Sequence, residues 1–333
     1  FVLSRRLAYC KLLTKCNIMQ KIPSVDLRDF LSDDPARKQK FVNEIGKAYE
    51  EIGFVALKGH FLDDKLVEDL YSEVRNFFNL PLETKEKYEI PGISGQRGYI
   101  SFGKEHAKGS DAPDLKEFFQ YGQIIEDGVV SPEAYPDNVK VSLPEDFNAL
   151  FNQSYRAFEV SGSALLSAIA MHLQLDDTYF DEHIYLGNSI LRAIHYPPIL
   201  QEPKSAIRAE QHEDINLITL LVGASADGLE ILGKNGEWLP VKAGPGEIVV
   251  NVGDMLQRLT NDRLKSTTHR VVNPPRENWH NSRFSIPFFL HPRSNMSLAC
   301  LPSCVSIDNP KLYDDYTAGY YLDERLREIG LKK

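Results

Sequence analysis

The stretch Gln211-His-Glu-Asp-Ile-Asn-Leu-Ile-Thr-Leu-Leu221 joins a polar, ionisable head to an apolar, β-branched tail. If this segment opens a β-strand, His212 and Asp214 lie two residues apart and point to the same face, while Glu213 points to the other. One imidazole beside one carboxylate supplies two ligands of a metal site. The pair alone is a weak signal, because such spacing also arises by chance. A third ligand from a distant strand is needed.

His269 is the best candidate for this third ligand. It lies in Ser266-Thr-Thr-His-Arg-Val-Val-Asn-Pro274, where it begins a β-branched run. Two histidines and one carboxylate on one face of an octahedron suit Fe(II) and leave three positions open for a co-substrate and O2. Zinc with four ligands would leave only one such position, so the chemistry would differ.

A second polar group follows on the predicted strand after His269. Arg283 and Ser285 share a face there, and a guanidinium beside a hydroxyl can bind a carboxylate at two points. An arginine inside so apolar a strand needs an anionic partner, which is either a structural Asp or Glu or a small-molecule carboxylate. Upstream, Tyr196 shares a strand face with Arg192 and could donate a hydrogen bond to the same carboxylate.

Short, β-branched segments separated by turns dominate the chain from Ile190 onward. We predict strands at Ile190–Tyr196, Asn216–Val222, Leu229–Leu232, Trp238–Val241, Glu247–Val252, Thr268–Val272 and Arg283–Leu290. Asn235-Gly236 lies between two of these and predicts a hairpin. This spacing favours an α+β protein with a mainly β core, a distorted double-stranded β-helix of the jelly-roll type.

The first half of the chain has helical periodicity. Apolar residues recur at helical spacing over 41–52, a buried strand is expected at Phe54–Leu57, and Asp63 is a suitable N-cap for a second helix. A polar loop is expected at 91–114, and a long helix from about Pro144 to about His172. We expect these helices to flank the barrel.

We expect one packed unit with four parts. Residues 1–18 form an N-terminal extension of uncertain role, 19–180 an N-terminal helical α/β part, 185–300 the jelly-roll core, and 301–333 a C-terminal helical tail. Residues 1–18 carry four basic residues and no acidic one. We interpret them as an upstream extension, with an organelle presequence as the minor alternative.

The composition narrows the set of partners. The formal net charge is -9 and basic residues form no dense stripe, which argues against nucleic acid. No apolar run approaches the roughly 20 residues of a membrane-spanning helix.

The cysteines Cys10, Cys16, Cys300 and Cys304 form no CxxC pair and match no zinc module. Free thiols in a reducing compartment, the cytoplasm, are the expectation.

In their order along the chain, the HxD pair, the distant His, RxS and the upstream Tyr-Pro-Pro resemble the isopenicillin N synthase-like, 2-oxoglutarate- and Fe(II)-dependent oxygenases. Other landmarks of the likeness are Ile22-Pro-Ser-Val-Asp-Leu27, Gly53-Phe54, Arg97-Gly-Tyr99, Asp114-Leu-Lys-Glu117 and the GEIVVNVGDMLQRLTND stretch. The resemblance therefore spans roughly residues 20–325 and is specific as an ordered set.

The resemblance implies an enzyme with Fe(II), 2-oxoglutarate and O2, ascorbate in support, and succinate and CO2 as co-products. A small organic substrate would be hydroxylated or otherwise oxidised. It assigns iron binding to His212, Asp214 and His269. It assigns binding of the far carboxylate of 2-oxoglutarate to Arg283 and Ser285, with help from Tyr196. Family members that use no 2-oxoglutarate carry the same Arg-x-Ser and Tyr, where these residues hold a substrate carboxylate.

Several alternatives stay open at this point. The protein could be a 2-oxoglutarate-independent Fe(II) oxidase of the cyclising or ethylene-forming type, a non-catalytic binding protein, or a zinc or manganese cupin-type hydrolase or isomerase. Phe289 is either a pocket wall or plain core. Arg192 either binds an anionic substrate group or forms a structural ion pair, which we favour. The stretch Tyr313–Arg327 is either a lid or a helix packed on the rim.

Overall fold

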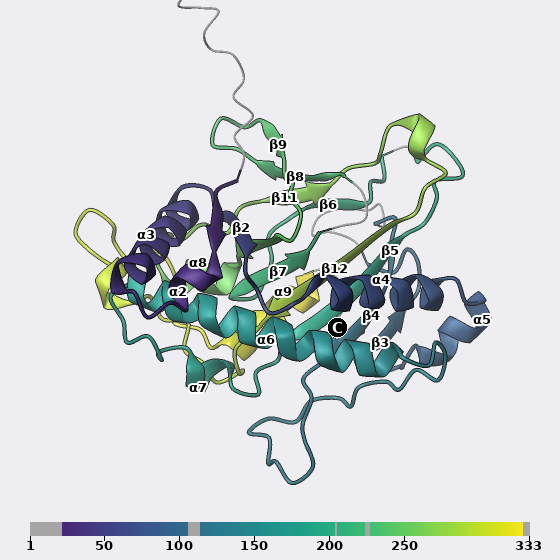
Figure 1. Ribbon diagram of the computed structural model, residues 1–333, viewed down its shortest axis with the longest axis horizontal. Coiled ribbons are helices and arrows are strands. Elements are labelled where there is room, and N and C mark those ends of the chain that lie inside the picture. Colours follow the sequence, from purple (N-terminus) through teal and green to yellow (C-terminus); the bar gives the residue numbers. More distant parts are fainter. Residues whose placement is uncertain (1–21, 106–113, 204, 224–226, 329–333) are drawn as a thin grey trace, which may run out of the picture.

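The computed structural model describes residues 22–105, 114–203, 205–223 and 227–328, so the predicted extension at 1–18 lies outside the described residues. The strands are β1 (Ser24–Asp26), β2 (Phe54–Lys58), β3 (Gly98–Ile100), β4 (Glu117–Gly122), β5 (Ile190–Tyr196), β6 (Ala209–His212), β7 (Ile218–Val222), β8 (Leu229–Leu232), β9 (Trp238–Pro240), β10 (Ile248–Val252), β11 (His269–Val271) and β12 (Arg283–Leu290). They form two sheets that face each other (Figure 1).

The larger sheet has the order β1-β2-β10-β7-β12-β5-β4-β3, and the smaller one β6-β11-β8-β9. Neighbouring strands are antiparallel except β1 and β2, which run parallel. This arrangement confirms the predicted jelly-roll fold, in which two antiparallel sheets enclose a cavity. The predicted hairpin at Asn235-Gly236 is also confirmed: it joins β8 to β9, and Gly236 has a φ of +79°.

The helices of the described residues lie mainly over the outer face of the larger sheet, and the last of them borders the space between the two sheets. They are α2 (Leu27–Phe30), α3 (Pro35–Glu51), α4 (Asp64–Phe78), α5 (Leu82–Lys85), α6 (Phe147–His172), α7 (Asp181–Ile184), α8 (Asp254–Leu259) and α9 (Ala318–Glu328), with short 3₁₀ turns at Glu86–Tyr88, Arg276–Asn278 and Pro302–Cys304. Figure 1 shows α4 and α6 side by side across this sheet. None of the described helices combines the length and apolar character that crossing a bilayer requires.

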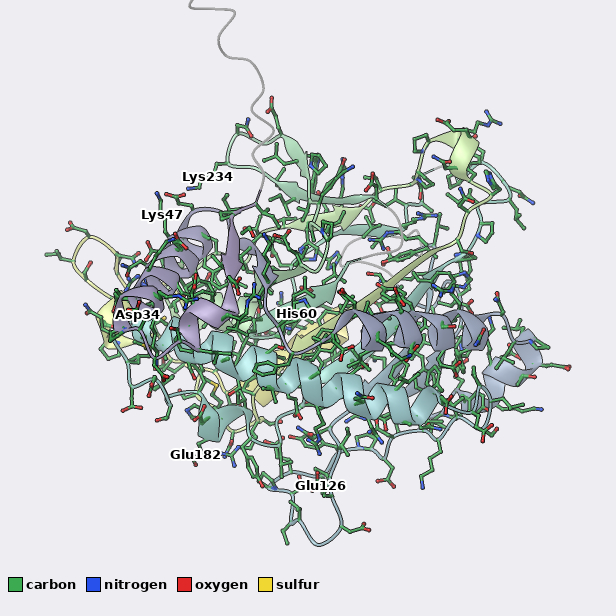
Figure 2. The ribbon with its side chains drawn as sticks, in the orientation of Figure 1. Asp34, Lys47, His60, Glu126, Glu182 and Lys234 are labelled. Carbon is green, nitrogen blue, oxygen red and sulfur yellow. The ribbon has the colours of Figure 1, made fainter. Side chains whose placement is uncertain are left out.

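The local sequence explains where these helices begin. Asp34 and Asp63 are the N-caps of α3 and α4, and each carboxylate accepts a hydrogen bond from a backbone N–H of the first turn. The prediction for Asp63 is confirmed. Charged side chains on the outside, such as Lys47 on α3 and Lys234 in the β8–β9 turn, project into solvent (Figure 2).

Two apolar clusters hold the layers together. The larger one fills the space between the helices and the large sheet, with Phe77, Phe147 and Phe288 fully buried in it. The smaller one lies between the two sheets and includes Ile194 from the large sheet and Ile231 from the small one. Polar side chains also lie between the sheets, and together with this cluster they line a pocket there.

Most predicted strands agree with the structure to within two residues, and the long helix begins at Phe147 rather than at about Pro144. The expectation that Gln211–Leu221 opens a strand is wrong, because β6 ends at His212 and β7 begins at Ile218. The side chain of Asn216 donates a hydrogen bond to the carbonyl oxygen of Ile218. Such local bonding favours a turn over a continued strand.

Candidate metal centre

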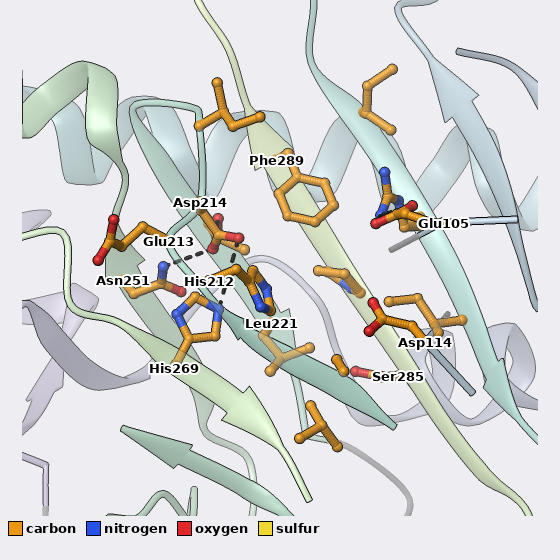
Figure 3. Close-up of a pocket in the computed structure, with 18 of the residues that line it drawn as sticks. Glu105, Asp114, His212, Glu213, Asp214, Leu221, Asn251, His269, Ser285 and Phe289 are labelled. Atoms are coloured by element: carbon orange, nitrogen blue, oxygen red, sulfur yellow. Dashed lines mark hydrogen bonds and ion pairs between the residues drawn. The ribbon is translucent and has the colours of Figure 1, made fainter. Parts of the chain in front are cut away.

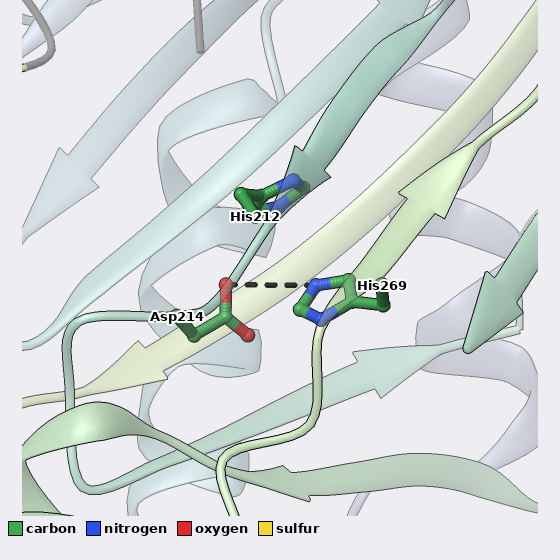
Figure 4. A group of neighbouring side chains, drawn as sticks. All are labelled: His212, Asp214 and His269. Atoms are coloured by element: carbon green, nitrogen blue, oxygen red, sulfur yellow. Dashed lines mark ion pairs between the residues drawn. The ribbon is translucent and has the colours of Figure 1, made fainter. Parts of the chain in front are cut away.

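The cavity between the sheets has a volume of about 590 Å³. His212 comes from the end of β6 and His269 from the start of β11, both on the small sheet, and Asp214 comes from the connection between β6 and β7. One ligand atom from each lies within 4.8 Å of the others. The structure therefore brings the three predicted residues together (Figure 4).

The two histidines are oriented by hydrogen bonds on their outer nitrogens. Nδ1 of His212 lies 2.6 Å from the carbonyl oxygen of Glu210, and Nδ1 of His269 lies 3.1 Å from that of Thr267. A carbonyl only accepts, so each Nδ1 carries the proton and each Nε2 keeps its lone pair for a metal. Nε2 of His269 lies 3.8 Å from Oδ1 of Asp214, the contact drawn in Figure 4.

The carboxylate of Asp214 is held in the same manner. Its Oδ2 accepts hydrogen bonds from the Thr219 hydroxyl at 2.6 Å and from the Asn251 amide at 2.8 Å. Burial raises the pKa of Asp214, but the neighbouring imidazoles and these two hydrogen bonds outweigh burial and leave the pKa below its usual value. The carboxyl is therefore ionised and presents Oδ1 to the centre.

His212 is neutral at physiological pH. Burial and, next, the nearby His269 lower the pKa of His212 to about 4. A neutral imidazole is the form that binds metal. The Nε2 atoms of His212 and His269 and one carboxylate oxygen, converging from one side of an open cavity, fit an Fe(II) ion with positions left for other ligands.

The predicted carboxylate-binding residues lie on the opposite wall of the cavity. Arg283 is paired directly with Tyr196 across β12 and β5, and Ser285 is paired with Ile194. All of these residues line the pocket, and the guanidinium carbon of Arg283 lies 5.0 Å from the centre of the Tyr196 ring. The structure thus brings Arg283, Ser285 and Tyr196 together on one face.

A second arginine stands beside this group and was not predicted. Arg208 is 2% exposed, and its guanidinium carbon lies 5.9 Å from the Tyr196 ring centre. Burial and the neighbouring Arg283 lower the pKa of Arg208 to about 10. Two buried guanidinium groups around one phenol make this end of the cavity strongly attractive to an anion. No motif marks Arg208 in the sequence.

Arg192 forms a structural ion pair, the role that we favoured over binding an anionic substrate group. Its guanidinium lies 3.3 Å from a carboxylate oxygen of Glu105 and stacks between the rings of Phe118 and Phe289, at 4.3 Å and 5.2 Å. Phe289 itself is a pocket wall (Figure 3), standing between the metal-ligand candidates and Glu105.

Glu105 belongs to a buried charge network that sequence reasoning did not find. Lys116 lies 3.1 Å from Glu105 and 2.8 Å from Asp114, and all three line the pocket. Burial raises the pKa of Glu105, but Lys116 and Arg192 outweigh it and lower the pKa to about 2. The spacing of Asp114 and Lys116, two residues apart just before β4, was the available signal.

The C-terminal stretch forms a helix on the rim of the pocket. Leu322 and Arg325 of α9 line the cavity, and the hydroxyl of Tyr321 donates a hydrogen bond to Asp254 at 3.0 Å. The guanidinium of Arg258 lies 4.8 Å from the Tyr321 ring and fixes the helix further. The helical alternative is therefore confirmed, and movement of α9 as a lid stays a prediction.

Two known sequence families match the chain. Residues 22–140 match the N-terminal region described as non-haem dioxygenase in morphine synthesis. Residues 187–292 match the 2OG-Fe(II) oxygenase superfamily. The second match contains all three candidate metal ligands and all three candidate carboxylate-binding residues.

Individual relatives agree with these matches over nearly the whole chain. The proline hydroxylase buaE of Petromyces alliaceus is 34% identical, over 92% of this chain and 98% of the relative. A crystal structure of a 2OG-Fe(II) oxygenase family protein from Caulobacter crescentus is 41% identical, with a TM-score of 0.82 over 92% of this chain and 99% of the other. A full-length Neurospora crassa protein, crystallised with alpha-KG and thymine, is 30% identical, with a TM-score of 0.79 over 92% and 96%.

Proposed function

Since the chain belongs to the 2OG-Fe(II) oxygenase superfamily, we propose that His212, Asp214 and His269 bind its iron. The protein is a non-haem iron oxygenase that depends on 2-oxoglutarate and O2. The observation that carries the assignment is the orientation of the three side chains. Each turns its outer atom to a hydrogen-bond partner in the protein and its inner atom to a common centre.

We propose further that Arg283, Ser285 and Tyr196 bind the far carboxylate of 2-oxoglutarate. The guanidinium and the hydroxyl can contact both carboxylate oxygens, and the phenol adds a third donor. Arg208 strengthens the positive field behind them without lining the cavity. This wall faces the metal-ligand candidates across the pocket, as the two ends of a short dicarboxylate require.

The bound iron would supply O2 activation, coupled to conversion of 2-oxoglutarate to succinate and CO2. The residues of the chain supply placement and shielding. Phe289 and Ile190 cover the large-sheet side of the cavity, and Leu322 covers the rim. Such apolar walls exclude water from the reacting centre. We propose hydroxylation or a related oxidation of a small organic substrate at this position.

Two observations support a small, polar, nitrogen-containing ring compound as the substrate. Among relatives, one is named for proline and another was crystallised with thymine, and both compounds are of this kind. A cavity of about 590 Å³ also suits a short dicarboxylate together with one small molecule. The buried charge network gives the wall beside Phe289 a polar character.

We also propose that residues 185–300 form the catalytic core, supported by 19–180 and by the tail at 301–333. The family matches at 22–140 and 187–292 agree with this division. A cytoplasmic location is proposed on the free thiols of Cys300 and Cys304, which suit a reducing compartment.

The function is tested by exchanging Arg283 for alanine. Protein is purified anaerobically, loaded with Fe(II), and assayed for 2-oxoglutarate binding by calorimetry and for succinate formation on exposure to O2. We expect the Kd of 2-oxoglutarate to rise by roughly 10- to 100-fold, because the variant loses the binding free energy of a charge-assisted hydrogen-bonded pair. Arg276→Ala, an exposed arginine in a 3₁₀ turn, is the control and should keep the wild-type Kd. An unchanged 2-oxoglutarate requirement in Arg283→Ala would instead indicate an oxidase whose substrate carboxylate occupies this wall.

A further inference from the structure

Two polar side chains line the pocket at the end that lies away from Arg283. His291 directly follows β12, and Asn188 lies two residues before the start of β5. Along β12 the inward residues run from Arg283 through Ser285 to Phe289 and on to His291. His291 therefore lies beyond Phe289, on the side opposite the proposed 2-oxoglutarate wall.

The backbone brings these two side chains close together. The Ser189 hydroxyl accepts a hydrogen bond from the backbone N–H of His291 at 3.1 Å, and the backbone N–H of Asn188 donates to the Pro292 carbonyl oxygen at 3.4 Å. A side chain at Gly187 would meet the His291 carbonyl oxygen at 2.4 Å, so glycine permits this approach. Asn188 and His291 are held side by side by the fold.

Both side chains have hydrogen-bonding capacity that the described part of the protein does not use. Nδ1 of His291 and Oδ1 of Asn188 are buried atoms without a hydrogen-bond partner among the described residues. His291 is 8% exposed as a whole. Because burying a polar atom without a partner is costly, such atoms in a pocket wall indicate a ligand that completes them.

The pair is electrically neutral. Burial lowers the pKa of His291 to about 4, so its imidazole carries one donor and one acceptor at physiological pH. The Asn188 amide likewise offers a donor and an acceptor. An uncharged partner with both functions, such as a carboxamide or a lactam, matches this pair.

The cations lining this end of the pocket are already paired with carboxylates. Arg192 lies 3.3 Å from Glu105, and Arg325 lies 2.6 Å from Glu328. A substrate carboxylate would have to displace one of these acids, whereas a neutral amide would not. The charges thus disfavour an anionic group beside Asn188 and His291.

We propose that Asn188 and His291 form a substrate-recognition subsite for a neutral amide group, either a carboxamide or a lactam, of the compound that the enzyme oxidises. This inference rests on the proposed function. The two side chains are positioned to fix the substrate at the far end of the pocket while its reacting carbon lies beside Phe289 and the metal centre.

The subsite is tested with matched pairs of probes: benzamide and benzoate, nicotinamide and nicotinate, prolinamide and proline. Each is titrated calorimetrically into anaerobic enzyme loaded with Fe(II) and 2-oxoglutarate. The wild type should bind the carboxamides at least about tenfold more tightly than the carboxylates, since a site built to hydrogen-bond a group discriminates against its unmatched analogue. In Asn188→Leu and His291→Leu this ratio should fall to near one.

His280→Leu, a change at an exposed histidine, is the control and should keep the wild-type ratio. His291→Gln, which restores a neutral donor and acceptor, should recover part of it. The inference is overturned if no carboxamide binds, if the carboxylates bind more tightly, or if both leucine variants keep the wild-type ratio. Failure of the proposed function is a separate result, seen as loss of 2-oxoglutarate binding by the wild type in the absence of any probe.

Discussion

His212 on β6 is the direct cross-strand partner of His269 on β11, and the centres of their rings lie 4.4 Å apart. The register of this short ladder therefore sets the distance between the two proposed nitrogen ligands. A slip by one residue would turn one histidine to the opposite face and abolish the site. The proposed metal centre depends on strand pairing as much as on the identity of its ligands.

The first prediction concerns this pair. His212→Ala and His269→Ala should each weaken Fe(II) binding by more than about a hundredfold. This loss of affinity is larger than the roughly 10- to 100-fold loss caused by removing a hydrogen-bond partner of a metal ligand. Metal content after anaerobic loading and desalting is the measurement, with succinate formation as a second readout. His280→Ala serves as the control for losing an exposed histidine. Retention of one iron per chain in either variant would remove that histidine from the metal site.

The second prediction concerns the partners of Asp214. Thr219→Val removes the hydroxyl that donates to Oδ2, and Asn251→Leu removes the amide. Both hydrogen bonds lower the pKa of Asp214. Without either one the pKa rises, so a higher pH is needed to keep the carboxylate ionised, and the midpoint of iron binding against pH should move upward.

Iron affinity at neutral pH should fall by roughly 10- to 100-fold in each variant, the usual effect of removing such a partner. Fe(II) titrations at a series of pH values measure both quantities. Asn76→Leu, on the exposed side of α4, should change neither. A midpoint that moves to lower pH would contradict the role given to these hydrogen bonds.

The third prediction concerns the buried Glu105. Its pKa is about 2 in the folded protein against an ordinary value of 4.5, because Lys116 and Arg192 outweigh burial. A carboxyl with a lowered folded pKa contributes stability that is present above pH 4.5 and lost as pH falls towards 2. The difference corresponds to up to about 3 kcal/mol.

Glu105→Gln should therefore be less stable than the wild type at neutral pH and should lose less stability on acidification across this window. Urea unfolding at several pH values gives the slopes to compare. Glu237→Gln, at an exposed carboxylate in the β8–β9 hairpin, should keep the wild-type slope. Equal slopes in the wild type and Glu105→Gln would show that Glu105 titrates normally.

The fourth prediction compares two glycines with similar backbone angles. Gly53 and Gly236 have φ values of +77° and +79°, in the left-handed region that side chains disfavour. At Gly53 an added Cβ would lie 2.1 Å from the Lys265 carbonyl oxygen, whereas at Gly236 it meets no described atom within 4 Å.

Gly53→Ala should thus lower the free energy of unfolding by about 3 kcal/mol or more, from backbone strain and steric overlap together. Gly236→Ala should cost only about 1 kcal/mol, from strain alone. Thermal and urea unfolding of both variants provide the comparison. Equal losses would mean that the contact with Lys265 is relieved without cost.

The sequence predicted β5 and β7 to β12 well, because each alternates or runs apolar between clear turns. It missed β6 as a separate strand that ends at His212, and with it the way in which Asp214 reaches the centre. The expected strand alternation does not place this carboxylate. The turn at Asn216 and the hydroxyl of Thr219 do so, through hydrogen bonds that a linear pattern does not show.

By itself the sequence identified the residue types proposed for the metal centre and for the carboxylate wall, because HxD, a distant His and RxS can be recognised from their order along the chain. Only the tertiary structure decided what surrounds them. Arg208 stands beside Tyr196 because the two sheets face each other there, and Asn188 stands beside His291 because β5 and β12, far apart in the chain, are paired. Isolated polar residues carry no periodic signal, so their joint chemistry exists only once folding has buried them side by side at or behind the wall of one cavity.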